Sequence, residues 1–222
     1  SQANGNGSLV NDAVVSGELT VGDIDSFVFE INAGEAVHIR MVDANATIFA
    51  PQVWLYNPDG TLERTTSNSV VAKLDCYSTS SGCRLDQTGV YRLLVEELGA
   101  NDPGTYEIHY IRVSQSNENG TLPNDGVVRG ELTLGDIDSF VFEASSGASA
   151  HIRLVETGGA AFSPQLWLYN PDGTLNDTTS GLTIADLDCD SSSTFGCRLD
   201  QNGIYRLLVD DTLSTRTGTY EI

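Results

Sequence analysis

An internal repeat is the sequence feature that most constrains how this chain can fold. The stretch GELTVGDIDSFVFE at residues 17–30 returns almost unchanged as GELTLGDIDSFVFE at residues 130–143. A displacement of 113 residues (130 minus 17) is too long for one unit of a solenoid and suits a whole small domain. The sequence therefore predicts two tandem domains of one fold, covering residues 1–113 and 114–222.

The two copies differ at their C-terminal ends. Copy 1 finishes with GTYEIHYIRV over residues 104–113, whereas copy 2 finishes with GTYEI at residues 218–222. Either the sequence is trimmed at this point or copy 2 has a truncated last strand. Half a strand missing from a sheet would leave an open edge, which another chain or a following segment usually covers.

Short alternating segments predict an all-β fold. The expected strands of copy 1 cover residues 26–31, 36–42, 52–56, 70–74, 84–86, 89–95 and 106–113, after a polar lead-in over residues 1–16. The run Asn57-Pro58-Asp59-Gly60 has the residues of a type I turn and predicts a hairpin. No segment of a dozen residues shows helical periodicity. Each copy is therefore predicted to be an antiparallel β-sandwich of seven or eight strands.

Four cysteines fall as two close pairs, one in each copy. They are Cys76 with Cys83 and Cys189 with Cys197. Each domain can thus close its own disulfide, which predicts an oxidising, exported setting. A loop of this length is worth about 2.5 kcal/mol on the chain-entropy estimate, enough to fix a hairpin but not to hold a domain together.

The chain is strongly acidic, with a formal net charge of -20 and Lys73 as its only lysine. A negative field of this size argues against nucleic acid and against anionic membrane surfaces as partners. It suits cations, or a salty extracellular habitat in which surface carboxylates keep a protein dispersed. No apolar run approaches the roughly 20 residues of a membrane helix, and no signal peptide opens the sequence, so we expect Ser1 to be a mature or trimmed start.

Three motifs in each copy resemble a known family. They are G-x-L-x-x-G-D-x-D-x-F-x-F, a Leu-Tyr-x-Pro-x-Gly hairpin and G-x-Y-x-x-x-V, found at residues 17–29, 55–60 and 89–95 and again at 130–142, 168–173 and 203–209. This pattern resembles the bacterial pre-peptidase C-terminal domain, which is similar to the collagen-binding modules of secreted bacterial collagenases. The resemblance implies jelly-roll-like sandwiches appended to exported hydrolases, and it covers both copies nearly end to end.

Acidic residues near the start of each copy predict a calcium site. The proposed ligands are Asn11, Asp12, Asp23 and Asp25, and their repeats Asn124, Asp125, Asp136 and Asp138. Calcium takes six to eight oxygen ligands, and carboxylates held close together need a cation to offset their repulsion. In the family that the chain resembles, the calcium-binding members are implied to use the Asn-Asp pair and the Gly-Asp-x-Asp turn. The alternative is that Asp23 and Asp25 cap a turn through their own backbone.

Aromatic residues form the second candidate site. Strand alternation places Trp54 and Tyr56 opposite Val53 and Leu55, and copy 2 repeats the pair as Trp167 and Tyr169. Outward aromatics could stack on sugar rings or bury one domain against a neighbour. The alternative is that the aromatic face packs in the core or under loops.

Catalytic motifs are not found: the sequence has no Gly-x-Ser-x-Gly elbow, no His-Glu-x-x-His and no phosphate loop. The repeated strand histidines His38 and His151 are expected to be surface pairs or packing residues. The sequence thus predicts a secreted, non-enzymatic, calcium-stabilised tandem sandwich that serves as an accessory or adhesive module of a larger extracellular protein. Its expected partners are an extracellular protein, a polysaccharide or copies of itself. The alternatives are a subunit of an extracellular filament or surface layer, and a carbohydrate-binding module.

Overall fold

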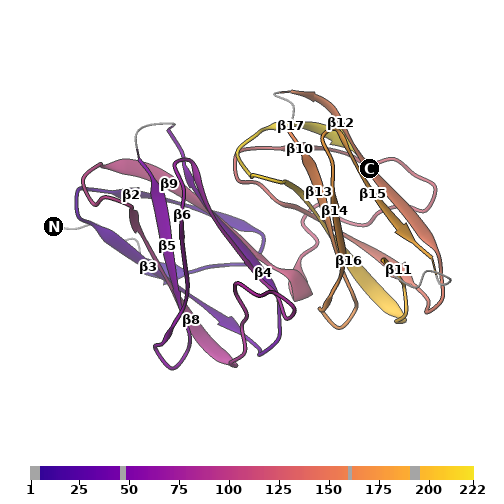
Figure 1. Ribbon diagram of the computed structural model, residues 1–222, viewed down its shortest axis with the longest axis horizontal. Helices are drawn as coiled ribbons and strands as arrows, with labels where there is room; N and C mark the ends of the chain where they lie inside the picture. The colour runs from indigo at the N-terminus through magenta and orange to yellow at the C-terminus, as the bar shows by residue number, and fades with distance from the viewer. Residues whose placement is uncertain (1–5, 46–48, 160–161, 191–195) are drawn as a thin grey trace. The chain divides into compact units, whose positions relative to one another are not determined.

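The chain forms two compact units of β-strands (Figure 1). The computed structural model describes residues 6–45, 49–159, 162–190 and 196–222. The units are Ser1–Arg112 and Val113–Ile222, so the division lies one residue before the expected one. In the described residues the only helical turn is η1 at Val113–Gln115. The all-β prediction is therefore confirmed, and each unit is treated separately below.

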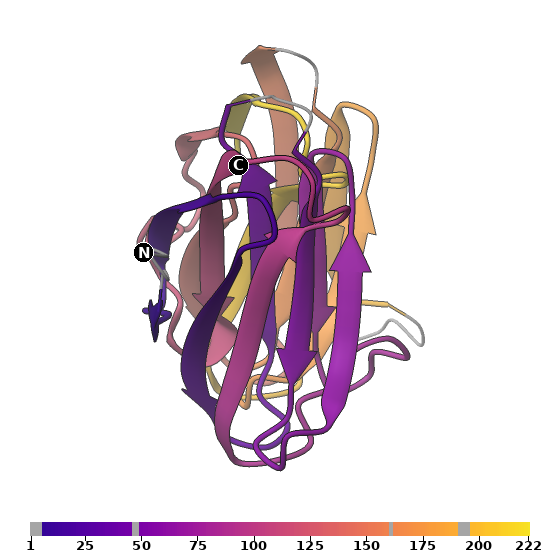
Figure 2. The same cartoon turned by 90° about the vertical axis from the view of Figure 1, so that its left-hand side faces the viewer.

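Unit 1 is a sandwich of a five-stranded and a four-stranded sheet. The first has the order β1-β3-β8-β5-β6 and the second the order β2-β9-β4-β7. The bounds are β1 Asn6–Ser8, β2 Ala13–Leu19, β3 Ile24–Ile31, β4 Val37–Asp43, β5 Pro51–Tyr56, β6 Leu62–Ser67, β7 Val71–Cys76, β8 Gly89–Glu97 and β9 Gly104–Arg112. All neighbours are antiparallel except β1 and β3, which run parallel. Figure 2 shows the indigo β2 beside the magenta β9, its partner along the whole strand.

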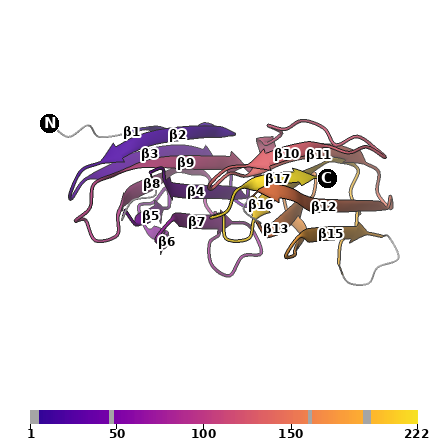
Figure 3. The same ribbon diagram turned by 90° about the horizontal axis from the view of Figure 1, so that it is seen from above.

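Unit 2 repeats this topology with two four-stranded sheets. Their orders are β11-β16-β13-β14 and β10-β17-β12-β15. The bounds are β10 Arg129–Leu132, β11 Asp138–Ala144, β12 Ala150–Gly159, β13 Pro164–Tyr169, β14 Leu175–Ser180, β15 Ile184–Cys189, β16 Gly203–Asp211 and β17 Gly218–Glu221. Figure 3 shows β17 between β10 and β12.

Three predicted details of the strands need correction. Residues 13–16 are not part of a polar lead-in, because β2 pairs with β9 from Ala13 to Leu19 and so orders this segment. Residues 84–86 are not a strand. Strand β6 was missed because its exposed, polar sequence LERTTS lacks apolar alternation, and it is fixed by pairing with β5. Strand β1 also lies within the expected lead-in and pairs with β3. In these missed strands, the pairing partner decides the conformation rather than local propensity.

The hairpin prediction is confirmed between β5 and β6. The Gly60 N–H donates to the Asn57 carbonyl over 2.9 Å, and Gly60 has a φ of 84°, which glycine adopts without a steric penalty. Both predicted disulfides are also formed. Cys76 bonds Cys83 with a Cα–Cα distance of 4.6 Å, and Cys189 bonds Cys197 with a distance of 4.4 Å.

The repeated motif joins the two sheets of each unit at one point. In unit 1 a Cβ on Gly17 would lie 2.3 Å from the Tyr106 ring, so only glycine leaves room for this ring. The Tyr106 hydroxyl reaches across the sandwich and donates to Asp25 at the start of β3. Unit 2 repeats the contact with Gly130, Tyr220 and Asp138. A glycine and an aspartate of the repeated motif therefore pack together with a tyrosine that lies 81 residues beyond the aspartate in unit 1.

Candidate functional site

The Asn-Asp pair of copy 1 forms a turn just before β2. Asp12 has a φ of 55°, and its backbone N–H donates to the Tyr110 carbonyl over 3.1 Å. The Asn11 side-chain oxygen accepts the Arg112 backbone N–H over 2.5 Å. The Arg112 guanidinium in turn pairs with Glu35 at 2.6 Å. The pair therefore holds the end of β9.

The Asp-x-Asp pair lies at the opposite end of β2. Asp23 accepts the backbone N–H of Ile24 over 3.0 Å, which is the turn-capping arrangement, and buried Asp25 accepts the Tyr106 hydroxyl. At about 3.4 Å per residue, the length of β2 separates the two pairs by about 20 Å. The structure thus does not bring Asn11 and Asp12 together with Asp23 and Asp25.

Copy 2 shows the same separation. Asn124 and Asp125 precede β10, whereas Asp136 and Asp138 follow it. Asp136 accepts the Ile137 N–H over 2.9 Å, as Asp23 does in copy 1. Within the residues that the structure describes, no group of three or more His, Cys, Asp or Glu side chains is placed to hold a metal ion. The eight predicted ligands therefore do not form the two calcium cages that the sequence suggested.

Asp138 has the most strongly perturbed environment of the predicted ligands. It accepts hydrogen bonds from the Tyr220 hydroxyl and, over 2.8 Å, from the Asn119 side-chain amide. Burial raises its pKa, and the nearby Asp136 carboxylate raises it further, so that the pKa of Asp138 is about 6 despite its two donors. Burial and Asp138 together raise the pKa of Tyr220, which keeps the donor protonated.

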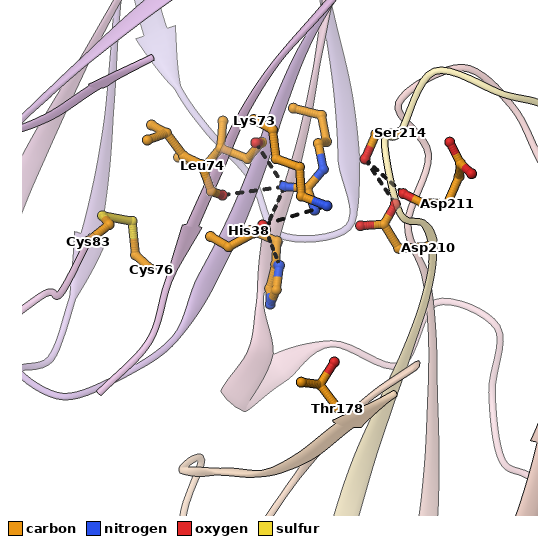
Figure 4. A network of polar contacts seen from close by, with 12 residues as sticks. His38, Lys73, Leu74, Cys76, Cys83, Thr178, Asp210, Asp211 and Ser214 are labelled. Atoms are coloured by element: carbon orange, nitrogen blue, oxygen red, sulfur yellow. Dashed lines mark hydrogen bonds and ion pairs between the residues drawn. A yellow bond between two sulfur atoms is a disulfide. The ribbon is translucent and has the colours of Figure 1, made fainter. Parts of the chain in front are cut away.

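A buried network on β4 and β7 of unit 1 surrounds Asp75. The Asp75 carboxylate lies 2.6 Å from Nδ1 of His38, 2.7 Å from the Arg40 guanidinium and 3.6 Å from Lys73 Nζ. Figure 4 shows His38 and Lys73 of this network, with Leu74, whose carbonyl accepts from Arg40. Burial alone would raise the pKa of Asp75, but Arg40 and His38 hold that pKa well below its ordinary value.

The corresponding network of unit 2 is exposed. His151 Nδ1 lies 2.9 Å from Asp188, and Arg153 pairs with Asp186 at 2.6 Å. Asp186 stands where copy 1 has Lys73, so two carboxylates, Asp186 and Asp188, lie beside the histidine and arginine of copy 2. Copy 1 thus has the packed histidine and copy 2 the surface pair, the two structural outcomes expected for a repeated strand histidine.

The aromatic pairs also differ between the copies. In β5, Val53 and Leu55 are buried while Trp54 and Tyr56 are partly exposed on the other face. The Trp54 indole N–H donates to Glu96 over 2.5 Å. In unit 2 both Trp167 and Tyr169 are buried. Trp167 and Tyr169 nevertheless lie outside the apolar core cluster of unit 2, which contains Leu166 and Leu168 from the opposite face of β13.

Sequence reasoning missed the tyrosines that contact the acidic turns. Tyr106 and Tyr220 belong to the repeated GTYEI motif, but nothing in local periodicity assigns them to Asp25 and Asp138 more than eighty residues away. The available signal was the repeat itself, which kept glycine, aspartate and tyrosine together in both copies.

Comparisons with known proteins found likenesses among solved structures only. No protein-family model matches, and no curated protein matches. The chain is similar to the pre-peptidase C-terminal domain of a Bacillus anthracis collagenase, with 18% identity over 50% of this chain and 98% of that chain and a TM-score of 0.39. It is also similar to Salmonella Typhimurium PliG, a periplasmic lysozyme inhibitor, with 19% identity over 48% and 96% of the two chains and a TM-score of 0.34. Membership in the family suggested by the motifs stays a prediction.

The raised pKa of Asp138 predicts a pH dependence of unit 2. Because the folded pKa lies above the ordinary value of 3.8, this group favours folding most below that value, and its contribution falls as the pH rises through about 6. We expect Asp138→Asn to stabilise unit 2 by about 1–3 kcal/mol near neutral pH and to have little effect near pH 4. Denaturant unfolding across this pH range measures the difference, which must shrink as the pH falls.

Two further measurements separate this effect from a packing change. Titration of the Asp138 carboxyl carbon by NMR should give a pKa near 6. The same titration in Asp136→Asn should give a lower value, since a neighbouring negative charge is removed. An Asp138 carboxyl that titrates near its ordinary value would contradict the prediction.

The two histidine networks predict opposite sensitivities to the loss of one carboxylate. Asp75→Asn leaves the buried Arg40 guanidinium without its carboxylate, so we expect unit 1 to lose about 3 kcal/mol of stability. Asp188→Asn is the matched change in the exposed network and should cost less than about 1 kcal/mol. Scanning calorimetry of both variants checks which of them loses more stability. Equal losses would show that burial does not determine the strength of these networks.

Proposed function

We propose that this chain is a non-catalytic, exported tandem β-sandwich that serves as an accessory or adhesive module of a larger extracellular protein. The observation that carries the proposal is the use of the repeated motif. Its glycine, aspartate and tyrosine meet inside each unit, where they join the two sheets, and do not converge on an open cavity. A repeated motif whose residues pack inside the core maintains a scaffold. The function of such a scaffold then depends on the surfaces that it presents.

Disulfides and charge support an extracellular setting. Each unit has one disulfide, and such bonds persist in oxidising compartments. The net charge of -20 suits a protein kept dispersed by surface carboxylates. No helix within the described residues is long and apolar enough to cross a membrane. The partners we propose are an extracellular protein or polysaccharide, or copies of the same chain.

The carbohydrate-binding alternative rests on Trp54 and Tyr56. Both are partly exposed, and Tyr56 lines a hollow together with Val28, Pro58 and Arg92. Trp167 and Tyr169 occupy the equivalent positions of β13 in unit 2.

Substrate and polysaccharide assays test the proposed function. We expect no turnover of peptide, glycoside or ester substrates, because the repeated polar residues are engaged in internal contacts. Activity that copurifies with the chain and disappears in a single Asp, Glu or His variant would contradict the proposal. Retention on an insoluble polysaccharide that is lost in Trp54→Ala and kept in Trp54→Phe would instead establish the carbohydrate-binding function.

Calcium stabilisation is a separate hypothesis, since its predicted ligands are divided between two ends of a strand. A bound ion at a hundredfold excess over its dissociation constant would add about 2.7 kcal/mol and raise the melting temperature by several degrees. From the separation of the ligands, we expect chelator-treated protein to show no shift of this size in millimolar calcium. An increase of several degrees in the melting temperature with calcium, lost in Asp12→Asn or Asp25→Asn, would instead support the calcium hypothesis.

A further inference from the structure

One face of the five-stranded sheet of unit 1 points away from the core. Along β3, β5 and β8, inward side chains are buried and the alternate ones are partly or fully exposed. We call the alternate side chains from Ile24 to Glu30, from Gln52 to Tyr56 and from Val90 to Glu96 the outward face. Many of them are aliphatic or aromatic, and an apolar patch on a surface marks an interaction site.

The strand register sets the central residues of the outward face in two neighbouring rows. The rows are Val28, Arg92 and Tyr56, and then Ser26, Leu94 and Trp54. Directly paired residues of antiparallel strands point to the same side of a sheet. Each aromatic ring of β5 therefore has a β8 side chain beside it, arginine in one row and leucine in the other.

A hollow of about 400 Å³ lies on the outward face. Its lining includes Val28, Tyr56, Pro58, Val90, Arg92 and Leu94. The turn between β5 and β6 contributes Asn57 and Gly60 as well, so the hollow continues from the sheet to this turn. Its volume falls within the range of known ligand sites.

Two polar contacts fix side chains of the outward face. The Trp54 indole N–H donates to Glu96 over 2.5 Å, so the ring extends from β5 toward β8. The Arg92 guanidinium donates to the Ser26 hydroxyl over 2.7 Å. An indole whose N–H is satisfied within the protein has its apolar surface left for a ligand. Side chains that are held in place before a ligand arrives also lose little conformational freedom on binding.

Copy 2 repeats the central residues of the outward face. Its equivalent positions hold Ser139, Val141, Trp167, Tyr169, Arg206 and Leu208. The edge strand of the same sheet changes, since Glu63 and Arg64 become Asn176 and Asp177. Outward side chains usually contribute little to stability, so their retention in both copies favours a binding role.

The charges of the outward face indicate the class of partner. They are Glu30, Arg92 and Glu96. An anionic polymer would be repelled by the two carboxylates and by the net charge of -20, whereas a basic polymer would place its charges beside Arg92. Apolar rings next to planar hydrogen-bonding groups instead suit a neutral ligand with hydroxyl groups around an apolar ring face. A sugar ring has this chemistry.

We propose that the outward face of unit 1 binds an unbranched, neutral polysaccharide. Its sugar rings stack on Trp54 and Tyr56, and its hydroxyl groups bind the Arg92 guanidinium and the Gln52 amide. The two aromatic residues lie two positions apart on one strand, about 7 Å along it, so one extended chain contacts both. The inference names the partner and the binding surface of the non-catalytic module proposed above, and it rests on that proposal.

NMR titration of the full chain with cellohexaose and chitohexaose tests the inference. The chain has two tryptophans, so Trp54→Phe assigns their indole signals. We expect the Trp54 indole N–H signal to shift saturably with at least one of these neutral sugars and not with hexagalacturonic acid. Tyr56→Ala should weaken binding at least about tenfold because stacked ring area is lost, whereas Tyr56→Phe should bind as the parent chain does.

Two further variants separate the polar contacts from a general surface effect. Arg92→Ala should weaken binding about tenfold, because a charged donor to the sugar hydroxyls is removed. Leu182→Ala is the control, since it removes a side chain of unit 2 that is 86% exposed, and it should leave the affinity unchanged.

The outcomes distinguish failure of the inference from failure of the proposed function. A Trp54 signal that responds to neither neutral sugar, or binding that is kept in full by Tyr56→Ala, would overturn the inference alone. So would a signal that responds to an extended polypeptide such as β-casein but to neither sugar. New reducing ends released from the oligosaccharides would contradict the non-catalytic module, and the inference would fall with it.

Discussion

The contact between a buried carboxylate and a tyrosine hydroxyl is the constraint on which each sandwich depends. Asp25 begins β3 in one sheet and Tyr106 lies on β9 in the other, so their hydrogen bond fixes the relative position of the two sheets. A carboxylate buried without a donor is costly, and a tyrosine ring needs space that a Cβ on Gly17 would occupy. Each residue therefore makes sense only in the presence of the other two, which explains why the motif occurs intact in both copies.

The equivalent strands β4 and β12 carry different networks of charged side chains, one buried and one exposed. In unit 1 the side chains of His38, Arg40 and Lys73 surround Asp75, and the network is largely buried. In unit 2 the lysine position holds Asp186, and the side chains of His151 and Arg153 are about half exposed. A buried network has to satisfy its charges internally, because water cannot screen them. Water screens the charges of an exposed network, so its ion pairs contribute little to stability and its residues are freer to change.

The sequence was sufficient for the repeat, the fold class, the hairpin at Asn57–Gly60 and both disulfides, since each follows from local pattern or from comparison of the copies. It was insufficient wherever contact with a residue distant in the sequence determines the conformation. Strands β2 and β6 lack a clear local signal and are set by β9 and β5. The calcium prediction grouped residues that are close in sequence, but β2 lies between Asp12 and Asp23 and places them at its two ends. Burial of Trp167 likewise cannot be read from a strand pattern identical to that around Trp54.

The Asn-Asp turn gains a function that its composition alone did not indicate. In unit 1 its amide oxygen and backbone N–H bind the backbone at the end of β9. In unit 2 the turn keeps the same backbone angle, with a φ of 54° at Asp125 against 55° at Asp12. A turn that keeps this angle in both copies belongs to the scaffold, as the contact between glycine, aspartate and tyrosine does.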